Sequence, residues 1–423
     1  KLGWWAARRI EGHDTGPKKH SATCSGLRRF DVRLHSIATL RPDRWDAVLE
    51  FAASPRSSVG VEWELMLADA TSGDLVPRAP DILADLEAGG DAIGITGELL
   101  TNTVEVISDP HSTVAGALDD IRTRLDLVHD AADPLGVRLL SAGSHPFAQW
   151  FDQQVTESTR YSTLIDRTQW WGRNMMIWGV HVHVGVENRE KVMPIIRAIT
   201  ARLPHLQALA ASSPFWAGEE TGYASNRALV FQQLPTAGLP WELADWAAYE
   251  RYLADMSRTG VMNDATDVRW DVRPAPHWGT VEVRACDGVS TLAELAALAA
   301  LTQCLVEDAS RRLDAGTALP SLPPWFAREN KWRAARYGLD AVAIVSADGD
   351  QVPVRDDLGR LVTELEPIAA DLGCLDELAG VTEILRTGAS HERQVAVARR
   401  TDGDLRAVVR HLFDEFETGR PTR

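Results

Sequence analysis

Acidic and imidazole side chains alternate with apolar ones in four short stretches of this sequence, at 59–67, 103–106, 180–186 and 281–285. Successive side chains of a strand point to opposite faces, so each stretch predicts a strand with one apolar and one charged face. The charged positions are Glu62, Glu64, Glu105, His181, His183, Glu282 and Arg284. If the four strands join one sheet, these side chains gather on one face and attract hard cations and phosphate.

Only Arg284 balances the acids on this predicted face, and like charges on neighbouring strands repel each other. We therefore expect a positive ion there. Carboxylate oxygens favour Mg²⁺, which proteins usually bind through a few carboxylates together with the phosphates of a substrate. The pattern thus indicates nucleotide chemistry that depends on Mg²⁺.

The two imidazoles on one strand face, His181 and His183, leave a different chemistry open because such a pair also suits Zn²⁺. A zinc ion that activates water would make the protein a metal-dependent hydrolase. No third strong nitrogen or sulfur ligand stands near this pair in the sequence. The hydrolase remains an alternative to the nucleotide enzyme.

Glu98 is a further candidate ligand, with one condition. It precedes Glu105 by seven positions, an odd offset that puts the two side chains on opposite faces of an unbroken strand. Both reach one ion only if residues 99–102 form a turn or a bulge. An exposed loop acid is the alternative interpretation.

Basic residues later in the chain are candidates for contacts to nucleotide and substrate. Guanidinium groups bind carboxylate or phosphate through paired hydrogen bonds, and lysine supplies a point charge. These candidates are Arg227, Arg273, Lys331 and Arg333. Each residue type is also common on an exposed surface. The sequence contains no Gly-x-x-x-x-Gly-Lys-Ser/Thr loop and no Gly-x-Gly-x-x-Gly motif, so metals and the sheet would have to hold a nucleotide.

The elements around these residues predict an α+β fold, in which the apolar face of an antiparallel sheet packs on helices. Apolar residues at three- and four-residue spacing predict an amphipathic helix at 113–132, which Pro134 and Gly136 end. The other predicted elements are a helix at 80–87, a hairpin at 94–106, a strand at 137–142, helices at 191–212, 246–259 and 291–313, and a mostly helical tail from residue 356.

Composition limits the class of protein. The 423 residues are 45% hydrophobic and 25% charged, which is ordinary for a folded globular chain. A formal net charge of -16 argues against broad contact with nucleic acid. Residues 1–47 differ, with ten Lys or Arg against five acids and no sustained apolar periodicity. We interpret them as a basic, poorly ordered extension of a catalytic domain at 48–423.

Cysteine use and hydropathy indicate where such a chain works. Cys24, Cys286, Cys304 and Cys374 are far apart, so neither a disulfide framework nor a zinc-thiolate site is indicated. No apolar run approaches the ~18 residues of a membrane helix, and no secretion signal opens the sequence. We expect a protein of the cytoplasm that contacts no membrane.

Five strings, taken in order, resemble one known family. They are GVEWE at 60–64, GVHVHVG at 179–185, TGYASNR at 221–227, GTVEVR at 279–284 and ENKWR at 329–333. Together they resemble the glutamate–cysteine ligase type 2 family, the carboxylate–amine ligases, from about residue 48 onward.

The resemblance implies a glutamine-synthetase-like fold whose curved antiparallel sheet holds ATP, several Mg²⁺ ions and an amino-acid carboxylate. The residues that match metal-binding positions of the wider superfamily are Glu62, Glu64, Glu98, Glu105, His181 and Glu282. Arg227 and Arg284 match positions near substrate or phosphate, and Arg273, Lys331 and Arg333 are expected to contact the nucleotide. His183 stands where related enzymes carry another polar residue, and its role stays open.

By the same resemblance the chain is expected to join the γ-carboxylate of glutamate to the amine of cysteine. The carboxylate first takes the γ-phosphoryl group of ATP, and the reaction releases ADP and phosphate, as in the biosynthesis of glutathione-type thiols. The expected partners are amino acids and ATP, and a homo-oligomer is left open. A third alternative is a protein that binds a nucleotide or an amino acid without catalysis.

Overall fold

The computed structural model describes residues 49–422. The basic segment 1–47 lies outside the described residues, so its interpretation as an extension stays a prediction. Among residues 49–422, no helix combines the length and the apolar character needed to cross a membrane.

Seven strands of the described residues form one sheet, and every neighbouring pair runs antiparallel. Six of them follow the order β2-β3-β1-β5-β9-β8, and β4 pairs with the far end of β1. The strands are β1 (Val59–Asp69), β2 (Ile95–Gly97), β3 (Thr103–Ile107), β4 (Val137–Leu140), β5 (Gly179–Gly185), β8 (Val272–Ala275) and β9 (Thr280–Asp287). The four charged stretches of the sequence are therefore adjacent strands, β3, β1, β5 and β9, as predicted.

Register brings the charged positions of these strands together. Glu62 of β1 lies opposite His181 of β5, and Glu64 lies opposite Glu105 of β3. On the next strand pair, His183 lies opposite Glu282. The side chains between them, such as those of Val61, Trp63 and Leu65, are almost completely buried on the other face. The alternation read from the sequence is thus the alternation of the sheet.

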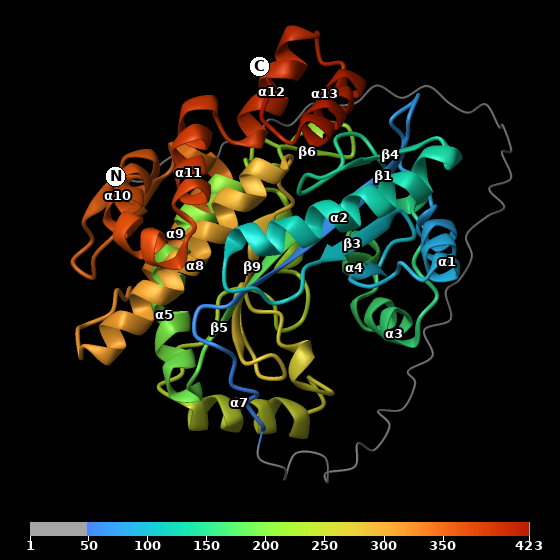
Figure 1. Ribbon diagram of the computed structural model, residues 1–423. Helices are drawn as coiled ribbons and strands as arrows, with labels where there is room; N and C mark the ends of the chain where they lie inside the picture. Colours follow the sequence, from blue (N-terminus) through green and yellow to red (C-terminus); the bar gives the residue numbers. More distant parts are fainter. Residues whose placement is uncertain (1–48, 423) are drawn as a thin grey trace, which may run out of the picture. The chain divides into compact units, whose positions relative to one another are not determined.

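Three long helices cover the apolar face of the sheet (Figure 1). They are α2 (Val114–Ala132), α5 (Arg189–Ala210) and α8 (Leu292–Asp314). Thr113 begins α2 by accepting a hydrogen bond from the Gly116 N–H, and Gly136, with φ +68°, ends the short 3-10 turn that follows it. Two helices of the C-terminal region, α10 (Val354–Leu372) and α11 (Leu375–Thr387), pack on α8.

A second, smaller core lies on the other face, at the far end of β1. Met66 and Ala68 point to this face and pack with Leu140, Trp178 and Phe413. The helices that cover it are α12 (Ser390–Arg400) and α13 (Leu405–Thr418). This cover leaves the middle of the charged face open, and the candidate site lies there.

Several elements were absent from the prediction, and short length is the common reason. β8 has only four residues and includes Pro274, so its sequence is typical of a loop. A two-stranded sheet, β6 (Phe215–Trp216) with β7 (Glu219–Glu220), was also not predicted. The predicted helices at 80–87 and 246–259 are present as α1 (Ala79–Gly89) and α7 (Trp246–Arg258). The elements that were not predicted also include α3 (Thr159–Thr168), α4 (Trp170–Arg173), α6 (Arg227–Phe231), α9 (Pro324–Tyr337), β10 (Val342–Ile344), β11 (Gln351–Pro353) and 3-10 turns at Asp133–Leu135, Trp150–Asp152, Ala265–Asp267 and Gly338–Asp340.

Candidate active site

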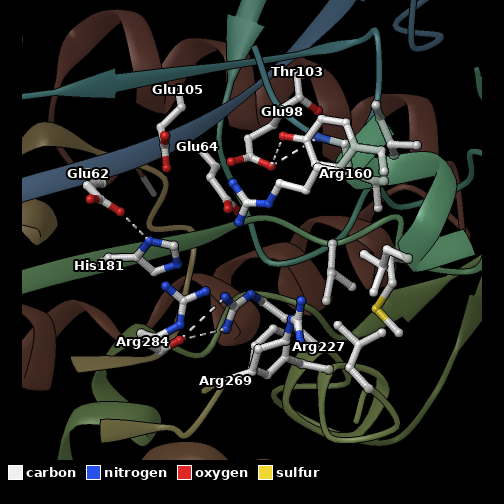
Figure 2. A pocket seen from close by; sticks show the side chains of 18 of the residues that line it. Glu62, Glu64, Glu98, Thr103, Glu105, Arg160, His181, Arg227, Arg269 and Arg284 are labelled. Carbon is white, nitrogen blue, oxygen red and sulfur yellow. Dashed lines mark hydrogen bonds and ion pairs between the residues drawn. The ribbon is translucent and has the colours of Figure 1, made fainter. Parts of the chain in front are cut away.

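A cavity of about 360 Å³ opens on the charged face of the sheet (Figure 2). Its charged lining residues are Glu62, Glu64, Glu98, Glu105, Arg160, His181, Arg227, Arg269, Arg273 and Arg284. They come from strands, from the loop after β2, and from α3 and α6. Acids and guanidinium groups therefore face one space.

The first cluster in this cavity consists of Glu64, Glu98 and Glu105, with ligand oxygens within 4.8 Å of one another. Residues 98–102 form the turn between β2 and β3, which brings Glu98 to the same side as Glu105. Burial, together with the charge of Glu98, raises the pKa of Glu64 to about 7. Burial and the charges of the neighbouring glutamates raise the pKa of Glu105 well above its ordinary value.

The second cluster consists of Glu62, His181 and Glu282, also with ligand atoms within 4.8 Å of one another. His181 Nδ1 lies 2.6 Å from an oxygen of Glu62. Burial lowers the pKa of His181 to about 4, so its ring is neutral near pH 7. A neutral imidazole that donates one N–H to Glu62 keeps a lone pair on the other nitrogen, which is the form that binds a metal ion.

Glu282, the third member of this second cluster, is completely buried, and both of its oxygens are already paired. Arg273 Nε donates to one oxygen at 2.6 Å, and Arg284 Nη1 donates to the other. Burial alone would raise the pKa of Glu282, but the charges of Arg273 and Arg284 hold it well below its ordinary value. Register explains the pair, because Arg273 of β8 lies opposite Glu282 of β9.

The predicted charge balance of this face was wrong. Arg284 was the one cation counted in the sequence, yet four further arginines line the cavity: Arg160, Arg227, Arg269 and Arg273. Arg227 and Arg273 were singled out as separate basic residues, whereas Arg160 and Arg269 were missed. Arg160 lies on α3 and Arg269 follows the 3-10 turn Ala265–Asp267, and neither element was predicted. The alternation of charged and apolar residues can identify only those site residues that lie on strands.

Arg227 is buried at the start of α6 without an acidic partner among residues 49–422. Both terminal nitrogens lie 3.4 Å from the carbonyl oxygen of Arg284, and Nε has no hydrogen-bond partner. A side chain at Gly179 would come within 2.1 Å of this guanidinium, so the close approach requires glycine there. A buried cation without an acid is an anion site.

Two of the predicted nucleotide contacts, Lys331 and Arg333, do not line this cavity, and their assignment stays a prediction. Lys331 Nζ is buried in an ion pair with Asp271 at 2.6 Å and lines a separate cavity. Arg333 contacts Glu329 and the carbonyl oxygen of Val342. Both residues lie on α9, which packs on α5 and β10 rather than on the charged face.

His183 does not join His181 in one ligand cluster of the described residues. Its Nδ1 lies 2.8 Å from Thr280 Oγ1, and its Nε2 lies 3.2 Å from a Glu62 oxygen. Burial opposes its protonation, but the neighbouring Glu282 and Glu62 raise its pKa. His183 is thus held by Thr280 and Glu62, and it does not form a paired-imidazole ligand set with His181 among the described residues.

The donor set fits Mg²⁺. Five carboxylates and one imidazole form the two clusters, and oxygen is the ligand that this ion prefers. Buried carboxylates whose pKa values are raised by each other are stabilised by a cation. Glu64, Glu98 and Glu105 would hold one ion, and Glu62, His181 and Glu282 another.

Comparisons with known proteins give a family match. The model of "Glutamate-cysteine ligase family 2 (GCS2)" matches residues 58–411. A relative from Leifsonia xyli subsp. xyli, named "Putative glutamate--cysteine ligase 2", is 56% identical over 373 residues, which cover 88% of this chain and 99% of the relative. A relative of the same name from Mycobacterium tuberculosis is 53% identical over 370 residues, 88% of this chain and 98% of that protein.

Solved structures share the fold. The glutamate–cysteine ligase of Francisella tularensis in complex with AMP aligns with a TM-score of 0.61 at 14% identity, over 85% of this chain and 89% of that one. A bifunctional glutathione synthetase from Pasteurella multocida aligns with a TM-score of 0.60 at 12% identity, over 85% of this chain and 52% of that one. At these identities the likeness concerns the fold, and it confirms the predicted glutamine-synthetase-like class.

Proposed function

The chain belongs to glutamate–cysteine ligase family 2, and from that premise we propose that it is an ATP-dependent ligase that joins the γ-carboxylate of glutamate to the amine of cysteine. One observation carries the proposal. Carboxylate and imidazole residues of both ligand clusters face the same cavity as Arg227, which has no acidic partner among residues 49–422. Such a site can hold a triphosphate and a carboxylate side by side.

The proposed reaction needs no protein nucleophile. A γ-carboxylate oxygen of glutamate attacks the γ-phosphorus of ATP, the bond to ADP breaks, and an acyl phosphate forms. The amine then attacks the acyl carbon, phosphate leaves and an amide remains. The protein contributes mainly alignment of the reacting atoms and neutralisation of their charge.

Each part of the cavity has a role in this scheme. Arg227 and Arg284 take the negative charge of the substrate carboxylate and of the transferred phosphoryl group. Arg273 fixes Glu282 in place through its 2.6 Å contact. Bound Mg²⁺ would offset the charge of the phosphates. The helices packed on the apolar face hold the strands that carry these groups in a fixed arrangement.

The test is a reaction of the purified full chain with ATP, Mg²⁺, glutamate and cysteine. We expect ADP and a γ-linked dipeptide in equal amounts, identified by mass spectrometry, and no ADP when either amino acid is absent. Replacement of Arg227 by methionine should raise the KM for glutamate, because its carboxylate loses a buried cation. ADP release that ignores both amino acids would refute the ligase.

A further inference from the structure

Glu98 differs from the other two glutamates of its cluster in what carries it. Glu64 and Glu105 project from β1 and β3, where they lie opposite each other in the register of two paired strands. Glu98 lies in the turn after β2 instead, yet Figure 2 shows it facing the same space as these two residues. A contact outside the sheet must therefore orient its carboxylate.

The segment just before α3 holds the turn that contains Glu98. The Thr156 N–H donates to the carbonyl oxygen of Leu99 at 2.9 Å, and the Thr156 hydroxyl donates to that of Glu98 at 2.6 Å. The Thr101 N–H donates to the carbonyl oxygen of Gln154 at 3.0 Å. These bonds fix the backbone of the turn, and none of them involves the carboxylate.

Tyr161 supplies a contact to the carboxylate itself. It lies in the first turn of α3, and its hydroxyl donates a hydrogen bond to Glu98 Oε2 at 3.2 Å. The same oxygen accepts the Leu99 N–H at 3.0 Å. Burial and the charge of Glu98 raise the pKa of Tyr161, so the phenol keeps its proton. Because both donors take Oε2, the other oxygen of Glu98 is left for a metal ion.

We propose that Tyr161 is a positioning residue for the first metal cluster, and that its hydroxyl turns Glu98 toward Glu64 and Glu105. This role rests on the proposed function, in which Glu98 holds a metal ion. A carboxylate that is oriented before the ion arrives loses less rotational freedom on binding. Hydrogen bonds to metal ligands typically strengthen metal binding by about tenfold or more.

The first experiment titrates the full chain with Mn²⁺ in a calorimeter, without turnover. Mn²⁺ takes oxygen ligands as Mg²⁺ does. Glu98→Ala identifies which binding step belongs to the first cluster. Tyr161→Phe removes one hydroxyl, and we expect it to weaken that step by about tenfold and to leave the other step unchanged. Tyr337→Phe, at a residue 46% exposed on α9, is the matched control and should bind Mn²⁺ normally.

The second experiment asks whether Tyr161 acts through Glu98. In the Glu98→Ala background, Tyr161→Phe should have no further effect on Mn²⁺ affinity, because the group that it positions is gone. In the ligase assay, Tyr161→Phe should raise the Mg²⁺ concentration for half-maximal rate by about tenfold and keep kcat at saturating Mg²⁺ near the parent value. Its unfolding temperature should stay within about 2 °C of the parent, since no residue of α3 is buried.

The outcomes separate this role from the ligase itself. Unchanged Mn²⁺ affinity in Tyr161→Phe would overturn the positioning role, and so would an equal loss in the Glu98→Ala background. If Tyr161→Phe raises the KM for an amino acid and not the requirement for Mg²⁺, the hydroxyl binds substrate and the inference is wrong. A parent protein that forms no γ-linked dipeptide, in which Tyr161→Phe still weakens the Mn²⁺ step of Glu98, would refute the ligase and support the positioning role.

Discussion

Glu105 shows how a single residue would depend on the ion proposed for this site. It is 6% exposed, and the charges of Glu62, Glu64 and Glu98 all raise its pKa, after burial as the main cause. Without a cation these carboxylates repel one another in a medium that screens charge poorly. The arrangement is unfavourable for folding alone, so it is retained for binding.

Glu105→Gln should separate stability from activity. The amide keeps the size of the side chain and removes its charge, so we expect ADP release to fall at least about 100-fold. Thermal unfolding without divalent ions should occur at the same temperature or slightly higher, because repulsion is relieved. Glu87→Gln, at an exposed position on α1, is the matched control. A Glu105→Gln protein that is active and responds to Mg²⁺ would contradict the assignment.

At the scale of secondary-structure elements, Asp287 at the end of β9 connects this strand to the segment after α5 and to the segment before α6. Its oxygens accept hydrogen bonds from the Ser212 N–H at 3.0 Å and from the hydroxyls of Ser213 and Ser225, each at 2.7 Å. The Ser213 hydroxyl in turn accepts from the backbone N–H of Arg227 at 3.0 Å. Asp287 therefore positions Arg227 without touching the cavity.

Asp287→Ala should weaken the binding of glutamate. We expect its KM to rise about tenfold with a smaller change in kcat, since Arg227 is displaced rather than removed. Stability should fall by about 3 kcal/mol, because buried donors lose a charged acceptor. Steady-state kinetics and urea unfolding measure the two effects, and Asp287→Asn should restore much of both. An unchanged KM with reduced stability would show that Asp287 serves the fold alone.

Asp357 of α10 contacts basic residues of α5 through its carboxylate. Protonation of this carboxylate at low pH should weaken the contact. His205 Nε2 lies 2.7 Å and Arg202 Nη1 3.2 Å from one of its oxygens. Burial by itself raises the pKa of Asp357, but the hydrogen bond to His205 and the charge of Arg202 lower it from 3.8 to about 2. A lowered folded-state pKa stabilises the protein above about pH 4, and this contribution disappears as the pH falls to about 2.

Asp357→Asn should therefore cost about 2 kcal/mol of unfolding free energy near neutral pH, and less as the pH falls from about 4 to about 2. Urea unfolding of both proteins across this range measures the difference. Asp356→Asn changes the exposed neighbour and should leave the profile unaltered. A difference that stays constant with pH would show that the charge of Asp357 is not responsible.

Most of the long strands and helices were predictable, whereas several short elements were not. β1 has 11 residues and β5 has seven, and charged and apolar residues alternate along both. Strands of this length show the two-residue period and identify which side chains lie on the apolar face. The turn that Glu98 requires was also deduced from its odd offset. In contrast, α3 was missed, and the four residues of β8 are too few to show a period. The positions of Arg160, Arg269 and Lys331 depend on tertiary packing, which spacing along the chain does not encode.

At the scale of the whole molecule, the family match begins at residue 58, after the basic segment 1–47. We propose that residues 48–423 fold and function as the catalytic domain without that segment. A chain that begins at Val48 should unfold within about 2 °C of the full chain and keep its ligase activity. Differential scanning calorimetry and the ADP assay measure both. Loss of cooperative unfolding in the shortened chain would contradict the proposal.

The pairing of Glu282 with Arg273 and Arg284 bears on the order in which ligands assemble. A dication that reaches this carboxylate must take it from two guanidinium groups, and those groups then need another anion. Triphosphate oxygens supply that anion. Under the proposed function, metal and nucleotide would therefore promote each other's binding by the same factor, as thermodynamic reciprocity requires. We expect the protein to bind either ligand alone weakly and the two together strongly.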